Sequence, residues 1–162
     1  DYDIAIIRGN ASEVMALLDV TQKTKGVDST MQSNDAIASA KTLSKQYNAA
    51  IIISGKVDVI VDQDLVEEFD RGSPLMPTIT GSGCLLTAVI GAFHAVEVDR
   101  FQAAKIGTLF YGICGEIAEQ NAKGPGTFRA EFLDALYSFE KLSSRKSPKA
   151  IVRDPLIACT KP

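Results

Sequence analysis

The sequence has 162 residues, of which 46% are hydrophobic, and this is enough for one domain with a hydrophobic core. Its 17 Lys and Arg residues are scattered and its formal net charge is -3, which excludes the basic footprint of a nucleic-acid-binding protein. The longest apolar stretch, Cys84 to Val96, is interrupted by Gly91 and His94 and is too short to span a bilayer, so it predicts a buried helix rather than a membrane segment. The three cysteines are far apart and odd in number, which favours reduced thiols in a cytoplasmic protein over a disulfide framework or a zinc site.

An apolar run with β-branched residues, Ile4 to Ile7, predicts a buried parallel strand close to the first residue. No leader or earlier element precedes this strand, and too few strands follow it for a complete doubly wound sheet. We therefore expect the chain to be the C-terminal part of a larger protein.

Asn10 and Glu13 have the spacing of a capping box and predict a helix that continues through Leu18. A second interpretation is compatible with the first: Glu13 faces the same crevice as Arg8 and acts on a metal–phosphate.

A polar stretch from Thr21 to Ser33 predicts a loop, after which Ser33 to Asp35 are expected to cap a helix that ends near Tyr47. A second buried strand, Ala49 to Ile53, follows and ends in Ser54 and Gly55. The order of strand, helix, helix and strand allows a right-handed crossover.

Two short strands, Val57 to Val61 and Leu65 to Phe69, flank a turn and predict a hairpin. Met76 to Thr80 predicts another short strand, which leads into a glycine loop. The helix that follows, Cys84 to about Val96, is apolar nearly all round and is expected in the core. We expect His94, within this helix, to be a core or interface residue rather than a catalytic one, because nothing pairs it with a nucleophile.

A further helix is predicted from about Phe101 to Ala122, and its glycines lower helix propensity by roughly 1 kcal/mol each. Close packing against a neighbour is the expected compensation at Gly107, Gly112 and Gly115. Lys123 to Phe128 predicts a tight loop before a last amphipathic helix, whose expected inward positions are Phe132, Leu133, Leu136 and Tyr137. From Ser143 the basic, proline-containing tail is expected to be extended or partly disordered, so the predicted domain covers residues 1–142 and the tail residues 143–162.

The glycine loop, Thr80-Gly81-Ser82-Gly83-Cys84, precedes an apolar helix directly. Glycines allow a close approach of a ligand, and a helix start offers backbone N–H groups and the positive end of the dipole. The pattern suits an anion, most simply a phosphate, although a plain strand-to-helix turn would have the same sequence signature.

Three predicted strand ends carry residues suited to a polyphosphate: Arg8 to Asn10, Ser54 with Gly55, and Gly81 to Cys84. Ligands of open α/β sheets bind outside the carboxyl ends of the strands. A guanidinium grips a phosphate bidentately, a serine hydroxyl bonds a phosphate oxygen, and a glycine loop neutralises charge that develops on an oxyanion. The combination predicts phosphoryl transfer, while the absence of a Walker loop from the sequence excludes a P-loop enzyme.

At these residues the sequence resembles hydroxyethylthiazole kinase, a family of the ribokinase-like superfamily. The resemblance extends in the family's order from Asp3 to about Phe139. It is carried by these runs: Arg8 to Glu13, Lys25 to Ser29, Ser54-Gly55 with Val57-Asp58, Gly72 to Met76, Thr80 to Leu86, and Gly124 to Phe128. Cysteine in the glycine loop separates this family from most ribokinase-like relatives, which have aspartate there.

The resemblance implies a ribokinase-like three-layer α/β/α fold with a mostly parallel sheet, whose N-terminal part is missing here. It also implies ATP-dependent phosphorylation of 4-methyl-5-(2-hydroxyethyl)thiazole in thiamine biosynthesis or salvage, by a homotrimer. Carried over by position, Arg8 and Ser54 contact ATP, with Ser54 standing where threonine is common in the family. Asn10 and Glu13 match the family's N-x-x-E pattern, which acts on Mg2+ and phosphate.

The same resemblance assigns the anion hole to the loop residues Gly81, Ser82, Gly83 and Cys84, with Gly81 also bordering the thiazole and its hydroxyl. A primary alcohol is far less acidic than a thiol, and phosphoryl transfer depends mainly on positioning and charge neutralisation. We therefore expect Cys84 to orient the hydroxyl or to take its proton late. The alternative for Cys84 is a small buried residue at a helix start.

Two other functions stay open at this point. One is a different ribokinase-like alcohol kinase, such as a hydroxymethylpyrimidine kinase, although Cys84 in place of aspartate argues against it. The other is a non-catalytic fragment that only binds nucleotide. Fusion of the natural protein to thiamine-phosphate synthase is also left open.

Overall fold

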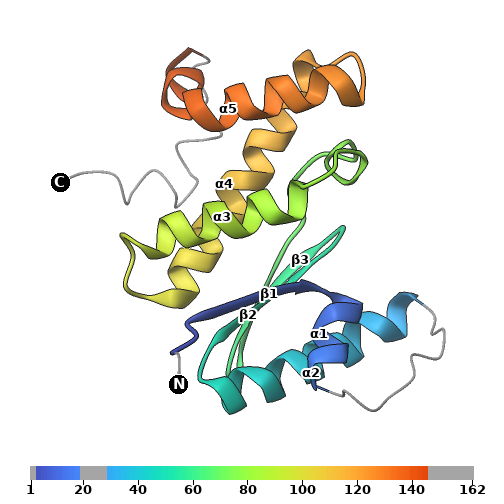
Figure 1. Cartoon of the computed structure of the whole chain (residues 1–162), viewed down its shortest axis with the longest axis vertical. Coiled ribbons are helices and arrows are strands. Elements are labelled where there is room, and N and C mark those ends of the chain that lie inside the picture. Colours follow the sequence, from blue (N-terminus) through green and yellow to red (C-terminus); the bar gives the residue numbers. More distant parts are fainter. Residues whose placement is uncertain (1–2, 19–28, 146–162) are drawn as a thin grey trace. The chain divides into compact units, whose positions relative to one another are not determined.

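The computed structural model describes residues 3–18 and 29–145, with the elements labelled in Figure 1. The chain divides into two compact units. The first, which we call the sheet unit, comprises Asp1–Asp70 and Thr87–Thr108, and the second, the helical unit, comprises Arg71–Leu86 and Leu109–Pro162.

The sheet unit contains a four-stranded sheet in the order β1-β2-β3-β4. Its strands are β1 (Ile6–Asn10), β2 (Ala50–Ser54), β3 (Asp58–Asp62) and β4 (Leu65–Phe69). β1 and β2 are parallel, as expected, and the β3–β4 hairpin is confirmed as antiparallel. β2 and β3 are also antiparallel, because the connection from Ser54 to Asp58 is far too short for a crossover. The expectation of a mostly parallel sheet is therefore wrong for the part of the chain that the structure describes, where the sheet is mixed.

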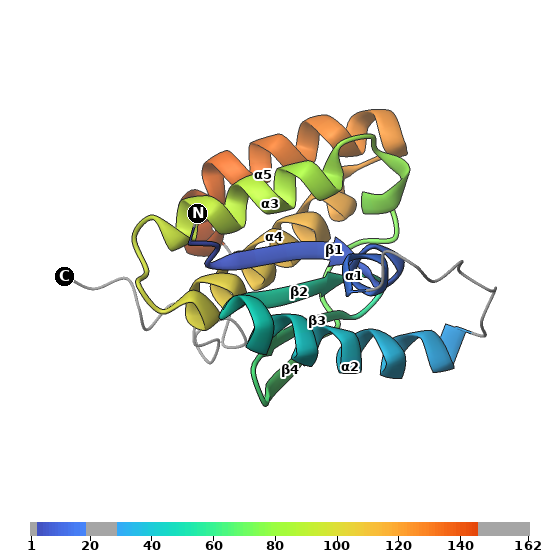
Figure 2. The ribbon, with the colours of Figure 1, turned by 60° about the horizontal axis from the view of Figure 1, so that its bottom comes forward.

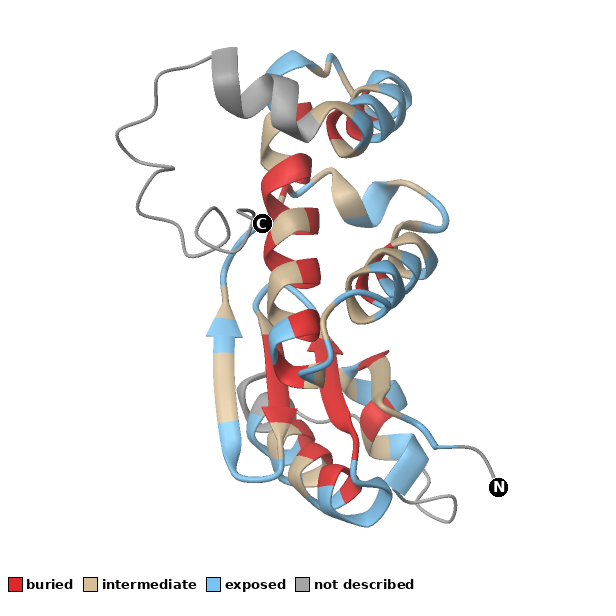
Figure 3. Ribbon diagram, turned by 90° about the vertical axis from the view of Figure 1, so that its left-hand side faces the viewer, coloured by how far each residue is buried: buried red, intermediate tan, exposed pale blue. Residues whose placement is uncertain are grey.

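One face of this sheet is covered by α1 (Ala11–Leu18) and α2 (Ser29–Tyr47) (Figure 2). Alternate residues of the central strands pack there against Val14 of α1 and Leu43 of α2: Ile51, Ile53, Val59 and Val61. The two central strands are buried, whereas the edge strand β4 is largely exposed or half-buried (Figure 3).

The opposite face carries the intervening residues, since side chains alternate along a strand. Arg8, Ile52, Ile60 and Glu67 are successive cross-strand partners, so all four lie on this face. Glu67 forms an ion pair of 2.7 Å with Lys105 of α4 (Arg100–Asn121), so the first turns of α4 lie against this second face. The sheet unit is thus a three-layer α/β/α arrangement, and the α/β fold class is confirmed.

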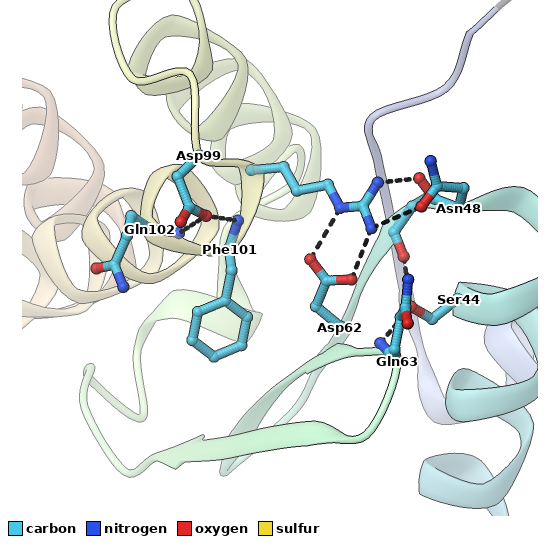
Figure 4. Close-up of polar contacts among 9 residues, drawn as sticks. Ser44, Asn48, Asp62, Gln63, Asp99, Phe101 and Gln102 are labelled. Carbon is cyan, nitrogen blue, oxygen red and sulfur yellow. Dashed lines mark hydrogen bonds and ion pairs between the residues drawn. The ribbon is translucent and has the colours of Figure 1, made fainter.

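Arg100, the first residue of α4, joins this helix to the sheet through Asp62 and Asn48, which are labelled in Figure 4. Its Nε and Nη2 atoms each donate to Asp62 at 2.8 Å, and its other contacts are the carbonyl and side-chain oxygens of Asn48. Asp99 caps the same helix by accepting the backbone N–H groups of Phe101 and Gln102. The Arg100 contacts join α4 to the end of β3 and to the turn before β2.

Two predicted helix starts are wrong, and in both cases the helix begins earlier. α2 begins at Ser29, so the loop predicted up to Ser33 ends sooner, and residues 19–28, with most of the Lys25–Ser29 run, lie outside the described residues. The polar side chains of Asn34 and Asp35 are exposed on this helix and do not interrupt it. α5 (Pro125–Arg145) begins inside the predicted 123–128 loop, because proline suits the first helical turn, where no N–H partner is needed.

The helical unit begins with a short 3-10 turn, η1 (Met76–Thr78), where a strand was predicted. Pro77 has no N–H to give to a sheet ladder, and the backbone bonds here run locally, from Thr78 N–H to the Leu75 carbonyl. The core of the unit is aromatic: Phe132 of α5 stacks on Phe128 at 5.5 Å and meets Tyr111 of α4 edge-on at 4.8 Å.

Two expectations about helix faces are only partly right. α3 (Ser82–His94) buries Leu86 and Ile90, but its Cys84, Thr87, Ala88, Gly91 and Ala92 are exposed, so it is not buried all round. On α5, Phe132 is buried as expected, whereas Leu133 and Tyr137 are 49% and 84% exposed. α5 continues to Arg145, past the predicted domain end at residue 142, and residues 146–162 of the predicted tail lie outside the described residues.

The predicted close packing at the α4 glycines is confirmed. A Cβ placed on Gly112 would lie 2.9 Å from the Arg71 Cβ and 3.1 Å from the Arg71 carbonyl carbon and oxygen. At Gly107 the nearest neighbour is Ile90, and at Gly115 it is Met76. Because these glycines have no side chain, other segments can approach α4 closely.

Gly112→Ala is expected to lower the free energy of unfolding by about 1–3 kcal/mol, because the backbone of Arg71 cannot yield as a flexible side chain would. Gly91→Ala is the matched control, since a Cβ on this exposed helical glycine meets nothing within 4 Å. There the substitution should raise stability by up to about 1 kcal/mol through helix propensity alone. Urea unfolding of both variants measures the difference, and equal stability of the two would contradict the packing account.

Candidate functional site

Arg8 and Ser54 meet at the carboxyl ends of β1 and β2. Arg8 Nη2 donates to Ser54 Oγ at 2.6 Å, and Ser54 Oγ lies 3.4 Å from the Gly9 carbonyl oxygen, to which it donates. The strand register explains the contact: Arg8 is the partner of Ile52, and Ser54 lies two residues further along the same face of β2. This is the sheet face opposite α1 and α2.

The Arg8 Nε atom is buried and has no hydrogen-bond partner among the described residues. A buried N–H left unsatisfied costs about 1–3 kcal/mol, so such groups require an explanation. A guanidinium has five N–H donors in a planar fork that matches the oxygens of a phosphate or carboxylate. An anionic oxygen would satisfy this donor, and the role of Arg8 in binding ATP stays a prediction.

Asn10 and Glu13 form the predicted capping box, which is confirmed. The Asn10 backbone N–H donates to Glu13 Oε2 at 2.7 Å, and the Glu13 N–H donates to Asn10 Oδ1 at 2.9 Å. Gly9 makes room for this arrangement, because a Cβ there would lie 3.1 Å from the Glu13 Cβ. The second interpretation, a role on metal and phosphate, stays a prediction for both residues.

Across the described ranges, no group of three or more His, Cys, Asp or Glu residues could hold a metal ion. Mg2+ is often held by only one or two carboxylates together with substrate phosphates. Glu13 is exposed, and only its Oε2 atom accepts a bond in the capping box, so one oxygen is left for such an ion. The donor set fits Mg2+ that arrives with a phosphate.

The glycine loop forms the start of α3, in the helical unit. Gly81 has φ of +88°, and its carbonyl accepts the Leu85 N–H at 2.9 Å, so the helix begins at Ser82. The Tyr111 hydroxyl donates to the Ser82 carbonyl at 2.6 Å and anchors this first turn to α4. Because η1 replaces the predicted strand, the loop does not follow a strand end among the described residues.

Nothing lies within 4 Å of a Cβ placed on Gly81, so the glycine is required by its backbone conformation and not by crowding. The Cys84 side chain is exposed. The expected alternative of a buried small residue is therefore wrong for Cys84 in the structure. Arg8 and the glycine loop belong to different units, and a joint action of the two stays a prediction.

A cavity of about 270 Å³ opens beside the loop, within the helical unit. Its walls are mainly apolar and are formed by these residues: Ile79, Thr80, Gly81, Ser82, Leu85, Arg129, Phe132 and Leu133. Sequence reasoning missed Arg129, although its spacing from Phe132 and Leu133 places the three on one helix face. The loop thus borders an open, mainly apolar cavity of the size of a small ring compound.

The two described cysteines should differ sharply in reactivity. Burial raises the pKa of the Cys114 thiol to about 12, whereas Cys84 is exposed at the helix start. Because the thiolate is the reactive form, iodoacetamide at pH 8 should alkylate Cys84 at least about tenfold faster than Cys114. Peptide mass mapping over time separates the two sites from Cys159, and equal rates at Cys84 and Cys114 would contradict the assigned environments.

Comparisons with known proteins identify the family of this chain. The model of the hydroxyethylthiazole kinase family matches residues 1–141. A hydroxyethylthiazole kinase from Desulfotalea psychrophila is 42% identical over 135 residues, which are 83% of this chain and 50% of that protein. One from Listeria welshimeri is 42% identical over 153 residues, 93% of this chain and 57% of that protein.

A solved structure of hydroxyethylthiazole kinase protein from Pyrococcus horikoshii OT3 superposes with a TM-score of 0.73 at 26% identity, covering 88% of this chain and 52% of that one. The chain thus spans about half the length of the curated relatives that it matches. Within residues 3–18 and 29–145, no helix combines the length and hydropathy that a bilayer crossing needs. Since the family model covers most of the chain, this chain belongs to the hydroxyethylthiazole kinase family.

Proposed function

We propose that the protein carrying this chain transfers the γ-phosphoryl group of ATP to the hydroxyl of 4-methyl-5-(2-hydroxyethyl)thiazole, a step of thiamine biosynthesis or salvage. Family membership supports the reaction class. The observation that carries the proposal is the buried, unsatisfied Nε of Arg8 beside Ser54, at the carboxyl ends of two parallel strands. Ligands of open α/β sheets bind at this end.

In this proposal Arg8 and Ser54 hold phosphate oxygens of ATP, and Asn10 lies at the same strand end. Arg8 supplies a positive charge and a donor that no described protein group uses. A charge-assisted hydrogen bond from a guanidinium to a phosphate is about twice as strong as a neutral one. The Ser54 hydroxyl fixes the guanidinium at 2.6 Å and so sets its direction.

The loop from Gly81 through Ser82 and Gly83 to Cys84 serves as the anion hole, with Gly81 also bordering the thiazole alcohol. The first turn of a helix stabilises negative charge through its N–H groups and dipole. Transfer through a loose transition state depends mainly on such charge stabilisation and on positioning. Cys84, exposed on this turn, orients the alcohol or accepts its proton late in the transfer.

Mg2+ is the metal that this chemistry requires, and it would neutralise the charge of the transferred phosphate. Glu13 is the residue proposed to act on it, by direct contact or through water, with Asn10 fixing the Glu13 position through the capping box. The remaining ligands would be phosphate oxygens and water, as is common for Mg2+.

The family resemblance further suggests a cytoplasmic homotrimer whose partner is a small-molecule substrate. A net charge of -3, with Lys and Arg scattered along the sequence, gives no support for a nucleic-acid partner.

The test is an ADP-release assay with ATP, Mg2+ and the thiazole alcohol, with mass spectrometric detection of the phosphate ester. One ester per ADP is expected. Faster turnover of a hydroxymethylpyrimidine than of the thiazole alcohol would instead favour a kinase of that substrate. Nucleotide binding without any ester would favour a non-catalytic module.

A further inference from the structure

Asp58 lies directly beside the Arg8–Ser54 contact, although no role has been given to it. It is the first residue of β3, which runs antiparallel to β2 with Ile53 opposite Val59. The next step of this register places Asp58 across from Ser54. Cross-strand neighbours share a face, so Asp58 lies on the same sheet face as Ser54 and Arg8, away from α1 and α2.

The Asp58 carboxylate makes a single hydrogen bond among the described residues. Its Oδ1 accepts the Gly55 backbone N–H at 2.9 Å, which closes the turn between β2 and β3. Burial raises the pKa of the Asp58 carboxyl, while the Gly55 N–H and the positive charge of Arg8 lower it in part. Arg8 is therefore near enough to act on Asp58 electrostatically, yet it hydrogen-bonds Ser54 and not Asp58.

These contacts link the position of Arg8 to Asp58. Asp58 fixes the N–H of Gly55, Gly55 follows Ser54 directly, and the Ser54 hydroxyl holds the Arg8 guanidinium at 2.6 Å. A donor that must meet a phosphate oxygen tolerates little displacement, and a misplacement of about 1 Å in an active site can cost a hundredfold in rate. The turn after β2 must therefore stay fixed if the Arg8 Nε–H is to point at a phosphate oxygen.

We propose that Asp58 is a positioning residue of the ATP site: by accepting the Gly55 N–H it fixes Ser54, and through Ser54 it keeps Arg8 directed at the nucleotide's phosphate. The inference rests on the proposed function, because it takes ATP as the ligand of Arg8. It assigns the role to the hydrogen-bond geometry of the Asp58 side chain rather than to its charge.

Two variants separate geometry from charge. Asp58→Asn removes the charge but keeps an Oδ1 acceptor at the same distance from the backbone. Asp58→Glu keeps the charge but moves the carboxylate one methylene outward, away from the Gly55 N–H. The control is Asp64→Ala, in the turn between β3 and β4, where an exposed carboxylate forms an ion pair of 2.7 Å with Lys45.

The readouts are the dissociation constant of a non-hydrolysable ATP analogue, by calorimetry on the protein that carries this chain, and the KM values for ATP and for the thiazole alcohol. Asp58→Glu should weaken analogue binding and raise the KM for ATP about tenfold, the upper end of what one ordinary hydrogen bond contributes. The KM for the alcohol should not change. For Asp58→Asn, both the dissociation constant of the analogue and the KM for ATP should stay within about threefold of the wild-type values. For Asp64→Ala, both should equal the wild-type values.

The inference would be overturned by the opposite order, in which Asp58→Asn binds the ATP analogue weakly and Asp58→Glu binds it almost as tightly as the wild type. That result would show that the charge of Asp58 matters. Wild-type binding in both variants would also overturn the inference. Analogue binding needs no alcohol, so it separates the two claims. If the wild type makes no thiazole phosphate but shows the expected order of analogue binding, the proposed reaction fails and the role of Asp58 stands. If the wild type binds no ATP analogue, both fail.

Discussion

Arg8→Ala is expected to raise the KM for ATP about a hundredfold, because a hydrogen bond to a charged group contributes about 1.5–3 kcal/mol. Arg8 is placed to supply such a bond from its Nε, which no described group satisfies. The loss should appear in binding of an ATP analogue as well as in steady-state kinetics. Folding should not suffer, because the variant also removes a buried and unsatisfied donor. The thermal midpoint is therefore expected to be equal to or above that of the wild type.

Ser54 provides the matched control for this result. Ser54→Thr keeps the hydroxyl that accepts from Arg8 Nη2, and its KM for ATP should stay close to the wild-type value. Ser54→Ala removes the hydroxyl that accepts the Arg8 hydrogen bond. Its KM for ATP should therefore lie between the values of the wild type and of Arg8→Ala. An Arg8→Ala variant that binds the ATP analogue normally, or that loses binding only because it unfolds, would contradict the assignment of Arg8.

The second large effect is expected at Gly81, where Gly81→Val should lower kcat by about 10²–10³, the cost typical of losing a donor to a developing charge. The reason is backbone conformation: Gly81 has φ of +88°, which valine cannot adopt without strain, while a Cβ there would meet nothing within 4 Å. The strain should be relieved by a shift of the first turn of α3, which carries the Ser82 and Cys84 backbone N–H groups.

A graded series tests this explanation. Asparagine tolerates positive φ better than other side chains, so Gly81→Asn should keep more activity than Gly81→Ala, and Gly81→Ala more than Gly81→Val. Gly91→Val, further along the same helix at an exposed position, should leave kcat unchanged. A loss that follows side-chain size, with Asn as harmful as Val, would point to a blocked cavity and against backbone strain.

Local sequence signals predicted much of the sheet unit. The Asn10–Glu13 capping box, the buried β2 strand and the β3–β4 hairpin follow from short-range spacing and are confirmed. The contact of Arg8 with Ser54 could also be anticipated, because parallel neighbours end at the same edge of a sheet. Such features depend on one segment or on one pair of strands.

The remaining features depend on tertiary context. The Met76–Thr80 segment has the apolar residues of a strand, but no strand among the described residues pairs with it, and Pro77 favours a local turn. The exposed side of α3 has small, apolar residues that composition alone assigns to a core. The sequence placed Asp58 in a predicted strand, whereas its hydrogen bond to the Gly55 N–H depends on the short antiparallel connection between β2 and β3.

The most direct measurement for the account as a whole is the ¹H–¹⁵N resonance of the Arg8 Nε–H group, assigned by its loss in Arg8→Lys, during titration with ATP and Mg2+. We expect this resonance to shift as ATP binds, because a phosphate oxygen then accepts the bond that no described residue accepts. A resonance that is unchanged at saturating ATP would contradict the assignment of Arg8 as the phosphate contact.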